Sequence, residues 1–236
     1  MKRNSIILLS FICLVCAQCS KNSSGPSPAA DFMLTAASTA IPAKVTLHNK
    51  STLALSCSWD FGNGKTSIDE NPAVIYTVPG TYEITLTATN TNGSTVARKT
   101  IVIEPAPTQC KIMSVKITNI PSSNDGSAWD LDGSTSDVYF RFLSAAGNII
   151  YTAPTYYNNP QTLPLSWDLA SPVSVSPLST ALEFELLDYD AGFLPDIMGD
   201  LAFAPSIAQT NLNDPYPAVW KLSYGDISIE LAVQWK

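Results

Sequence analysis

The sequence predicts an all-β chain made of two tandem antiparallel β-sandwiches, and three observations lead to this class. Short runs in which apolar and polar residues alternate occur along the chain, whereas no long window has the three- and four-residue apolar spacing of a helix. Turn-forming residues separate these runs. The runs lie at residues 81–89, 138–142, 182–187 and 227–235. A proline-containing break at 104–109 divides them into two folding units, because proline cannot donate to a β-ladder.

The composition supports two ordinary cores, since 45% of the 236 residues are hydrophobic. The net charge of -7 is unevenly placed along the chain. Residues 110–236 carry fourteen Asp and Glu against five Lys and Arg, whereas residues 28–106 carry six against five. The acidic half would repel phosphate backbones and anionic headgroups, so we expect no nucleic acid partner and favour cations.

The first nineteen residues have the pattern of an export signal. Lys2 and Arg3 form a basic start, and residues 6–15 form an apolar run that is too short to span a membrane. The segment 1–19 is therefore predicted to be a signal peptide that is removed on export.

This segment ends at Cys19, which is followed by Ser and Lys. The arrangement resembles a bacterial lipoprotein signal of the Bacteroidetes type, in which the Cys is lipidated and becomes the new N-terminus. The resemblance implies that Cys19 anchors the protein to its own outer membrane, in that membrane or at the cell surface. Alternatively, residues 15–17 form an ordinary cleavage site, and the protein is secreted.

The five cysteines fall into two groups. Cys13, Cys16 and Cys19 have metal-ligand spacing, but they lie in the export segment, so we expect no metal there. The mature chain otherwise keeps Cys57 and Cys110. A disulfide between these two would have to join separate folding units, so we expect both to remain thiols.

Behind the signal, the chain is predicted to have three parts. Residues 20–29 have no apolar periodicity and form a flexible tether that reaches at most about 30 to 35 Å. Residues 30–105 form the first sandwich, and residues 106–236 form the second.

The first unit contains a strand that runs into a glycine-rich turn. Residues 56–64 read Ser-Cys-Ser-Trp-Asp-Phe-Gly-Asn-Gly, which places Trp59 and Phe61 on the inward face of the strand. Gly62 and Gly64 follow where the turn calls for positive φ.

Further motifs follow in a defined order. They are an Asn-Pro turn pair at 71–72, Pro-Gly-Thr-Tyr at 79–82, Leu-Thr-Ala-Thr-Asn at 86–90 and an Asn-Gly hairpin signal at 92–93. Together with Trp-Asp-Phe-Gly-Asn-Gly, these motifs resemble the PKD domain over about 30–104. The resemblance implies an immunoglobulin-like sandwich that acts as a spacer or interaction module. Within the first motif, we expect Asp60 and Asn63 to satisfy the backbone of the turn and not to bind a ligand.

The second unit contains the acidic loops that favour metal chemistry. Asp188, Asp190 and Asp196 lie on one loop between two predicted strands. Carboxylates gathered in this way repel one another and need a cation. Calcium suits them, because it takes six to eight hard oxygen ligands in flexible geometry. A second acidic stretch at 130–137 leads into another strand, and two such loops can share one ion.

These loops resemble the calcium loops of the C2 domain, whose later loop reads Asp-x-Asp, five residues, Asp, two apolar residues and Gly. The resemblance covers about 110–236 and implies a C2-like Greek-key sandwich with a bound calcium ion. The implied ligands are Asp132, Asp137, Asp188, Asp190 and Asp196, with Asp130 as the alternative to Asp132. We expect a weak site, with a dissociation constant on the order of 10⁻⁴ to 10⁻³ M.

Two apolar residues, Phe193 and Leu194, lie between the acids of the later loop. Membrane-docking C2 domains insert apolar tips at this position, so phospholipid binding is a minor hypothesis. Local packing or simple exposure explains them equally well, and the unit lacks a basic strand for anionic lipid.

The sequence contains little that favours catalysis. His48 is the only histidine, so neither a Ser-His-Asp arrangement nor a histidine zinc site can be assembled. We therefore expect a non-catalytic surface lipoprotein that binds protein or carbohydrate with the help of calcium. The alternatives are an accessory subunit or small hydrolase of extracellular polysaccharide processing, and a purely structural spacer.

Overall fold

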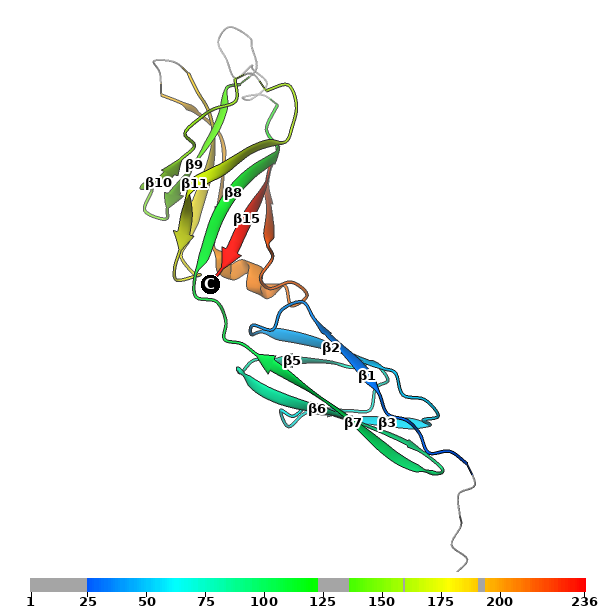
Figure 1. Cartoon of the computed structure of the whole chain (residues 1–236). Helices are drawn as coiled ribbons and strands as arrows, with labels where there is room; N and C mark the ends of the chain where they lie inside the picture. The colour runs from blue at the N-terminus through cyan, green and yellow to red at the C-terminus, as the bar shows by residue number, and fades with distance from the viewer. Residues whose placement is uncertain (1–24, 123–135, 159, 191–193) are drawn as a thin grey trace, which may run out of the picture.

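The structure is a computed structural model, and it describes residues 25–122, 136–158, 160–190 and 194–236. The described residues form fifteen strands and one short 3₁₀ helix, so the predicted all-β class is confirmed. The strands build two antiparallel sandwiches that follow one another along the chain (Figure 1). Among the described residues, no helix is long and apolar enough to cross a membrane.

The first sandwich packs a three-stranded sheet against a four-stranded sheet. The first sheet contains β1 (Phe32–Ala36), β2 (Ala43–Asn49) and β5 (Ala73–Tyr76). The second contains β4 (Thr66–Ser67), β3 (Ser56–Asp60), β6 (Gly80–Asn90) and β7 (Gly93–Ile103). Trp59 and Phe61 are buried as predicted, and the Trp59 ring meets Phe32 edge-on with centroids 5.2 Å apart.

The turn after β3 has the local chemistry that the sequence predicts. The N–H of Gly62 donates to Asp60 Oδ1 at 2.8 Å, and the N–H of Lys65 donates to Asn63 Oδ1 at 3.1 Å. Gly62 and Gly64 have φ values of 73° and 81°. Both acceptors therefore stabilise the turn.

The hairpin between β6 and β7 is confirmed, but its turn lies one residue earlier than the Asn-Gly signal indicates. Asn90 pairs with Gly93, so Thr91 and Asn92 form the turn. The physical reason is the Asn90 side chain, whose Oδ1 accepts the Asn92 N–H at 2.8 Å and whose Nδ2 donates to the Leu53 carbonyl at 2.8 Å. Gly93 consequently begins the next strand.

The tether predicted for 20–29 needs correction over residues 26–29, which are bound to the first sandwich. Ala29 exchanges backbone hydrogen bonds with Thr52 at 2.9 and 3.0 Å. The Pro28 carbonyl accepts from Thr95 Oγ1 at 2.9 Å, and the Pro26 carbonyl accepts from Asn90 Nδ2 at 3.1 Å. Composition indicates a polar linker here, but prolines keep their carbonyls as acceptors and the sandwich supplies the donors.

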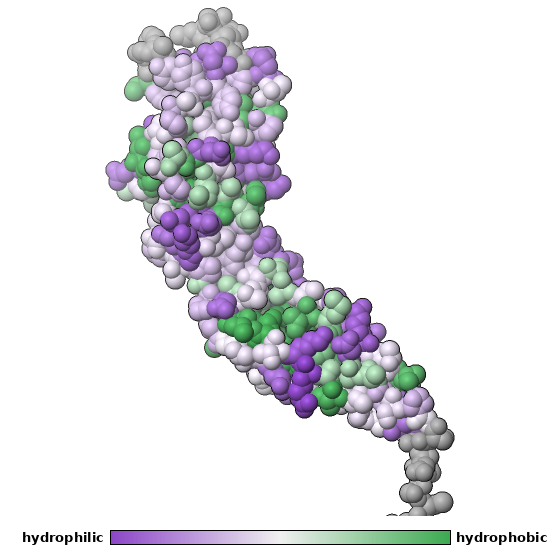
Figure 2. All heavy atoms as spheres, in the orientation of Figure 1, coloured by the Kyte–Doolittle hydropathy of each residue, from purple (hydrophilic) through white to green (hydrophobic). Residues whose placement is uncertain are grey.

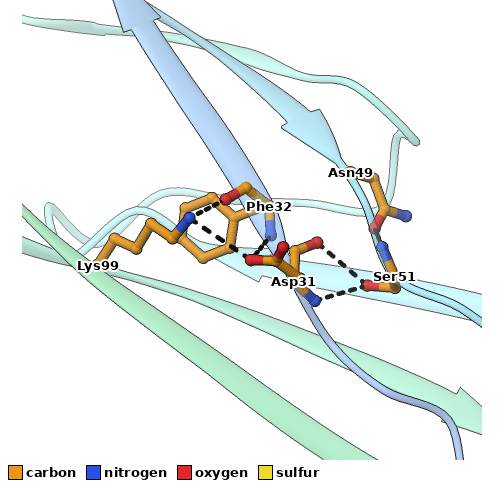
Figure 3. Close-up of polar contacts among 5 residues, drawn as sticks. All are labelled: Asp31, Phe32, Asn49, Ser51 and Lys99. Carbon is orange, nitrogen blue, oxygen red and sulfur yellow. Dashed lines mark hydrogen bonds and ion pairs between the residues drawn. The ribbon is translucent and has the colours of Figure 1, made fainter.

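A lysine links the two sheets where β1 and β7 form their edges (Figure 3). Lys99 Nζ lies 3.5 Å from Asp31 Oδ1 and 5.1 Å from the Phe32 ring centroid, and it also donates to the Phe32 carbonyl. Ser51 binds the Asp31 backbone from the other side. The start of β1 is thus fixed to both sheets.

The second sandwich contains two four-stranded sheets. One holds β10 (Ile149–Thr152), β9 (Val138–Ser144), β12 (Leu182–Asp188) and β13 (Asp196–Phe203). The other holds β11 (Leu165–Val175), β8 (Cys110–Asn119), β15 (Ile227–Trp235) and β14 (Val219–Tyr224). The 3₁₀ helix (Pro205–Thr210) lies between β13 and β14. The inner faces meet in an aromatic core around Phe140.

Each sandwich has its own hydrophobic core, and the two cores share no residue. Polar contacts join the sandwiches: Lys44 Nζ donates to Asn213 Oδ1 at 2.8 Å, and the Tyr216 hydroxyl donates to the Ile41 carbonyl. The sandwiches are therefore joined by polar side chains and not by a common core.

On the face shown in Figure 2, hydrophobic residues form small patches among hydrophilic ones.

The two mature-chain thiols differ in exposure, and this difference is testable. Cys110 is fully buried, and burial raises the pKa of its thiol to about 12, whereas Cys57 is half-buried. Only thiolates react with disulfide reagents. We expect a chain that begins at residue 20 to release one equivalent of thionitrobenzoate from Ellman's reagent at pH 8 when folded, and two in concentrated urea. Two rapid equivalents from the folded chain would contradict the burial of Cys110.

Candidate ligand-binding end of the second sandwich

Three neighbouring strands bring predicted site residues to one end of the second sandwich. Asp188, the last residue of β12, pairs with Val138 at the start of β9 and with Asp196 at the start of β13. Asp137 directly precedes β9. The antiparallel register therefore places Asp137, Asp188 and Asp196 at the same end of one sheet.

Asp188 has an unusual environment for a carboxylate, because it is fully buried. Its Oδ1 accepts the Asp137 backbone N–H at 2.6 Å. In return, the Asp137 carbonyl accepts the Tyr189 N–H at 2.9 Å. These bonds fix the start of β9 against the end of β12.

The other predicted ligands do not converge with Asp188 into a metal centre within the described residues. Asp137 Oδ2 accepts Asn158 Nδ2 at 3.3 Å, Asp190 is partly exposed and Asp196 is exposed. Within the ranges that the structure describes, no three His, Cys, Asp or Glu side chains form a group that could hold a metal ion. The calcium site therefore stays a prediction.

Some of the predicted residues fall outside the described part of the chain. Asp130 and Asp132 lie within 123–135, and Phe193 lies within 191–193. Leu194 is described and is 89% exposed. The C2 resemblance and the lipid hypothesis, which depend on these loops, are not tested by the structure.

The structure also shows a tyrosine cluster that the sequence analysis missed, formed by Tyr139, Tyr156 and Tyr189. The Tyr156 and Tyr189 rings are stacked, with centroids 4.6 Å apart and planes 17° apart. Tyr139 meets Tyr189 edge-on at 6.3 Å. Tyr189 lies between Asp188 and Asp190 in the sequence, and this position beside two predicted ligands could have indicated that Tyr189 belongs to the site. We call the stacked pair, Tyr156 and Tyr189, the tyrosine platform.

The segment that carries Tyr156 is held firmly at the edge of β9. Tyr157 and Val138 exchange two backbone hydrogen bonds of 2.9 Å. The Tyr157 ring packs edge-on against Trp167, and Trp167 Nε1 donates to the Thr155 carbonyl at 3.0 Å. Bonds on both sides of Tyr156 therefore fix its backbone.

The basic residues of the second sandwich either form ion pairs or lie beside the linker. Arg141 forms an ion pair with Glu185 across β9 and β12. Lys116 and Lys221 each lie 2.9 Å from Glu230, and their hydrogen bonds, that of Lys221 first, lower the pKa of Glu230. The other two bases, Lys111 and Lys236, lie beside the linker, because Lys111 pairs with Gln234 and Lys236 bonds the backbone of Gln109.

Other candidate sites carry less chemistry. His48 is exposed on β2. A hollow of ≈ 680 Å³ lies on the first sandwich beside Cys57, and Glu70 is the only carboxylate among its lining residues. A single carboxylate and an exposed histidine do not make an acid–base pair, so neither place indicates catalysis.

Comparisons with known proteins match the first sandwich. A family model described as PKD domain matches residues 25–104. The pre-pro-metalloprotease PrtV of Vibrio cholerae is 34% identical over 79 residues, which are 33% of this chain and 9% of that protein. The chain thus spans about a tenth of the length of the curated relatives it matches.

Solved structures match the same region. The PKD1 domain of Vibrio cholerae PrtV is 34% identical, with 34% of this chain and 99% of that chain covered and a TM-score of 0.30. The PKD1 domain of Vibrio anguillarum Epp is 30% identical, with 34% and 96% covered and a TM-score of 0.30.

Proposed function

Because residues 25–104 form a PKD domain, a non-catalytic module of extracellular proteins, we propose that this chain is a non-catalytic surface lipoprotein. In this proposal residues 1–19 direct export and lipidated Cys19 holds the chain at the outer membrane. The PKD domain spaces the second sandwich from the anchor, and the second sandwich binds the ligand with the help of calcium.

One observation supports the calcium part: the register of β9, β12 and β13 places the backbones of Asp137, Asp188 and Asp196 at the same end of one sheet. Their carboxylates are the hard oxygen donors that calcium prefers. Burying a carboxylate such as Asp188 is costly in the ionised form, and a bound cation offsets that cost. The type of donor atom in these residues therefore suits calcium. Asp190, together with Asp132 or Asp130, would complete the ligand set.

When bound, calcium would supply fixed positive charge that joins the two acidic loops. Outside the cell a site of this weak affinity is filled most of the time, so the ion acts as a structural clip or a bridge to ligand and not as a switch. Asp188 fixes the start of β9 by accepting the Asp137 N–H. Residues beside this bond would therefore hold a fixed position when they contact a ligand.

Calcium is therefore expected to raise the melting temperature of the second sandwich. At a calcium concentration about ten times the dissociation constant, binding stabilises by about 1.4 kcal/mol, or roughly 3 to 6 °C for a sandwich of this size. Differential scanning calorimetry of residues 20–236 in EDTA and in 5 mM calcium measures the shift.

The variant Asp190→Asn should lose most of this response, because one ligand charge is removed. Asp214→Asn is the matched control, since Asp214 is an exposed acid in the loop before β14 and is not a predicted ligand. An unchanged melting temperature of the wild-type chain on going from EDTA to calcium would rule out the calcium part of the proposal.

A further inference from the structure

We propose, on the premise that the second sandwich is the binding module, that the tyrosine platform binds the sugar rings of an uncharged polysaccharide. Tyr156 and Tyr189 are 45% and 40% exposed although they stack on each other. A pyranose ring presents a face of C–H bonds that packs on an aromatic ring, while its hydroxyl groups point outward to polar partners.

The platform is organised before any ligand arrives. Tyr189 is fixed by its N–H bond to the Asp137 carbonyl and by the edge of Tyr139. Tyr156 is fixed by the bonds that hold Thr155 and Tyr157 on either side of it. A ligand that stacks here orders neither backbone segment, so little binding free energy is lost to ordering the protein.

Polar residues that suit sugar hydroxyls lie close to both tyrosines along the chain. Asn158 follows Tyr157, and its amide lies 3.3 Å from Asp137 Oδ2. Asp190 follows Tyr189 and is partly exposed. An apolar face with a few convergent hydrogen-bonding groups is the usual make-up of a small-ligand site.

The charge distribution selects an uncharged polymer. The five carboxylates of the predicted ligand set outnumber the two positive charges of one calcium ion, so this end stays net negative and would repel acidic polysaccharides. The bases of the second sandwich pair with Glu185 and Glu230 or lie beside the linker. A stable protein interface needs roughly 800 Å² on each partner with an apolar centre. The tyrosine platform offers too small an apolar surface for a stable protein interface, because carboxylates and an amide border its two rings. One or two sugar rings match its size.

Affinity gel electrophoresis of residues 20–236 tests the proposal, with β-glucan, xylan, mannan and galactan as neutral probes and alginate as the acidic probe. We expect retardation by at least one neutral polymer and none by alginate. Tyr156→Ala and Tyr189→Ala should each weaken the retardation roughly tenfold, because each removes a stacking ring. The matched control is Tyr224→Ala, since Tyr224 is 71% exposed on the same sandwich outside the cluster.

Retardation by no neutral polymer, or equal retardation of all three variants and wild type, would overturn the proposal. So would a Tyr156-dependent interaction with a protein in place of a glycan. Calcium binding is tested separately, by the calorimetric shift of the melting temperature between EDTA and calcium. Tyr156-dependent retardation that persists in EDTA would support the platform while the calcium part fails, and a normal calcium shift without retardation would have the opposite meaning.

Discussion

Replacing Gly62 with alanine is expected to destabilise the first sandwich by about 2 to 4 kcal/mol, combining a backbone cost of about 1 to 2 kcal/mol with a steric clash. The backbone cost arises because Gly62 has a φ of 73°, in the region that L-residues avoid. The clash arises because an added Cβ would lie 2.6 Å from the Glu83 carbonyl oxygen. Since Glu83 belongs to the long strand β6, neither group can move cheaply. Urea unfolding followed by circular dichroism measures the loss.

Gly64 offers a control two residues away in the same turn. Its φ of 81° imposes a similar backbone cost, but nothing lies within 4 Å of an added Cβ. Gly64→Ala should therefore cost only about 1 to 2 kcal/mol. If Gly62→Ala and Gly64→Ala proved equally destabilising, the close approach of Gly62 to β6 would play no part in the stability of the turn.

The features that were predictable from sequence are those set by neighbours along the chain. The burial of Trp59 and Phe61 follows from strand alternation. The bonds from Gly62 to Asp60 and from Lys65 to Asn63 span two residues each, so the turn motif alone indicates them.

Features that depend on distant segments were predicted less well. The turn of the β6–β7 hairpin shifted by one residue because Asn90 also binds Leu53, which is 37 residues away. Residues 26–29 read as a tether because their partners, among them Thr52 and Thr95, are remote in sequence. Composition reports the polarity of a segment but not the donors that another strand will offer it.

The candidate site likewise combines features set by neighbours along the chain with features that depend on distant segments. The acidic motifs stand next to strands that alternation identifies, and the register places Asp137, Asp188 and Asp196 at the same end of one sheet. Whether their oxygens converge is a property of loop conformation, which sequence spacing does not determine. The tyrosine platform depends on Tyr156 reaching Tyr189 from a segment more than thirty residues earlier, and no local pattern contains that contact.

Replacing Phe140 with alanine is expected to have the largest effect on the second sandwich, a loss of about 3 to 5 kcal/mol. The Phe140 ring is fully buried, with its centroid 5.2 Å from that of Trp167 and 5.5 Å from those of Phe142 and Phe184. Its removal would leave a cavity at the meeting point of both sheets. Calorimetry of residues 20–236 should show the transition of the second sandwich at a lower temperature.

The same experiment tests how independent the sandwiches are. Their cores share no residue, and side chains such as Lys44 and Tyr216 contribute polar contacts that are worth about 1 kcal/mol each. Phe140→Ala should therefore leave the first transition within a few degrees of its wild-type temperature. Trp59→Ala should do the reverse, because Trp59 belongs to the first core. A single transition that both variants lower equally would mean that the two sandwiches unfold as one cooperative unit and that their junction is stronger than its polar contacts indicate.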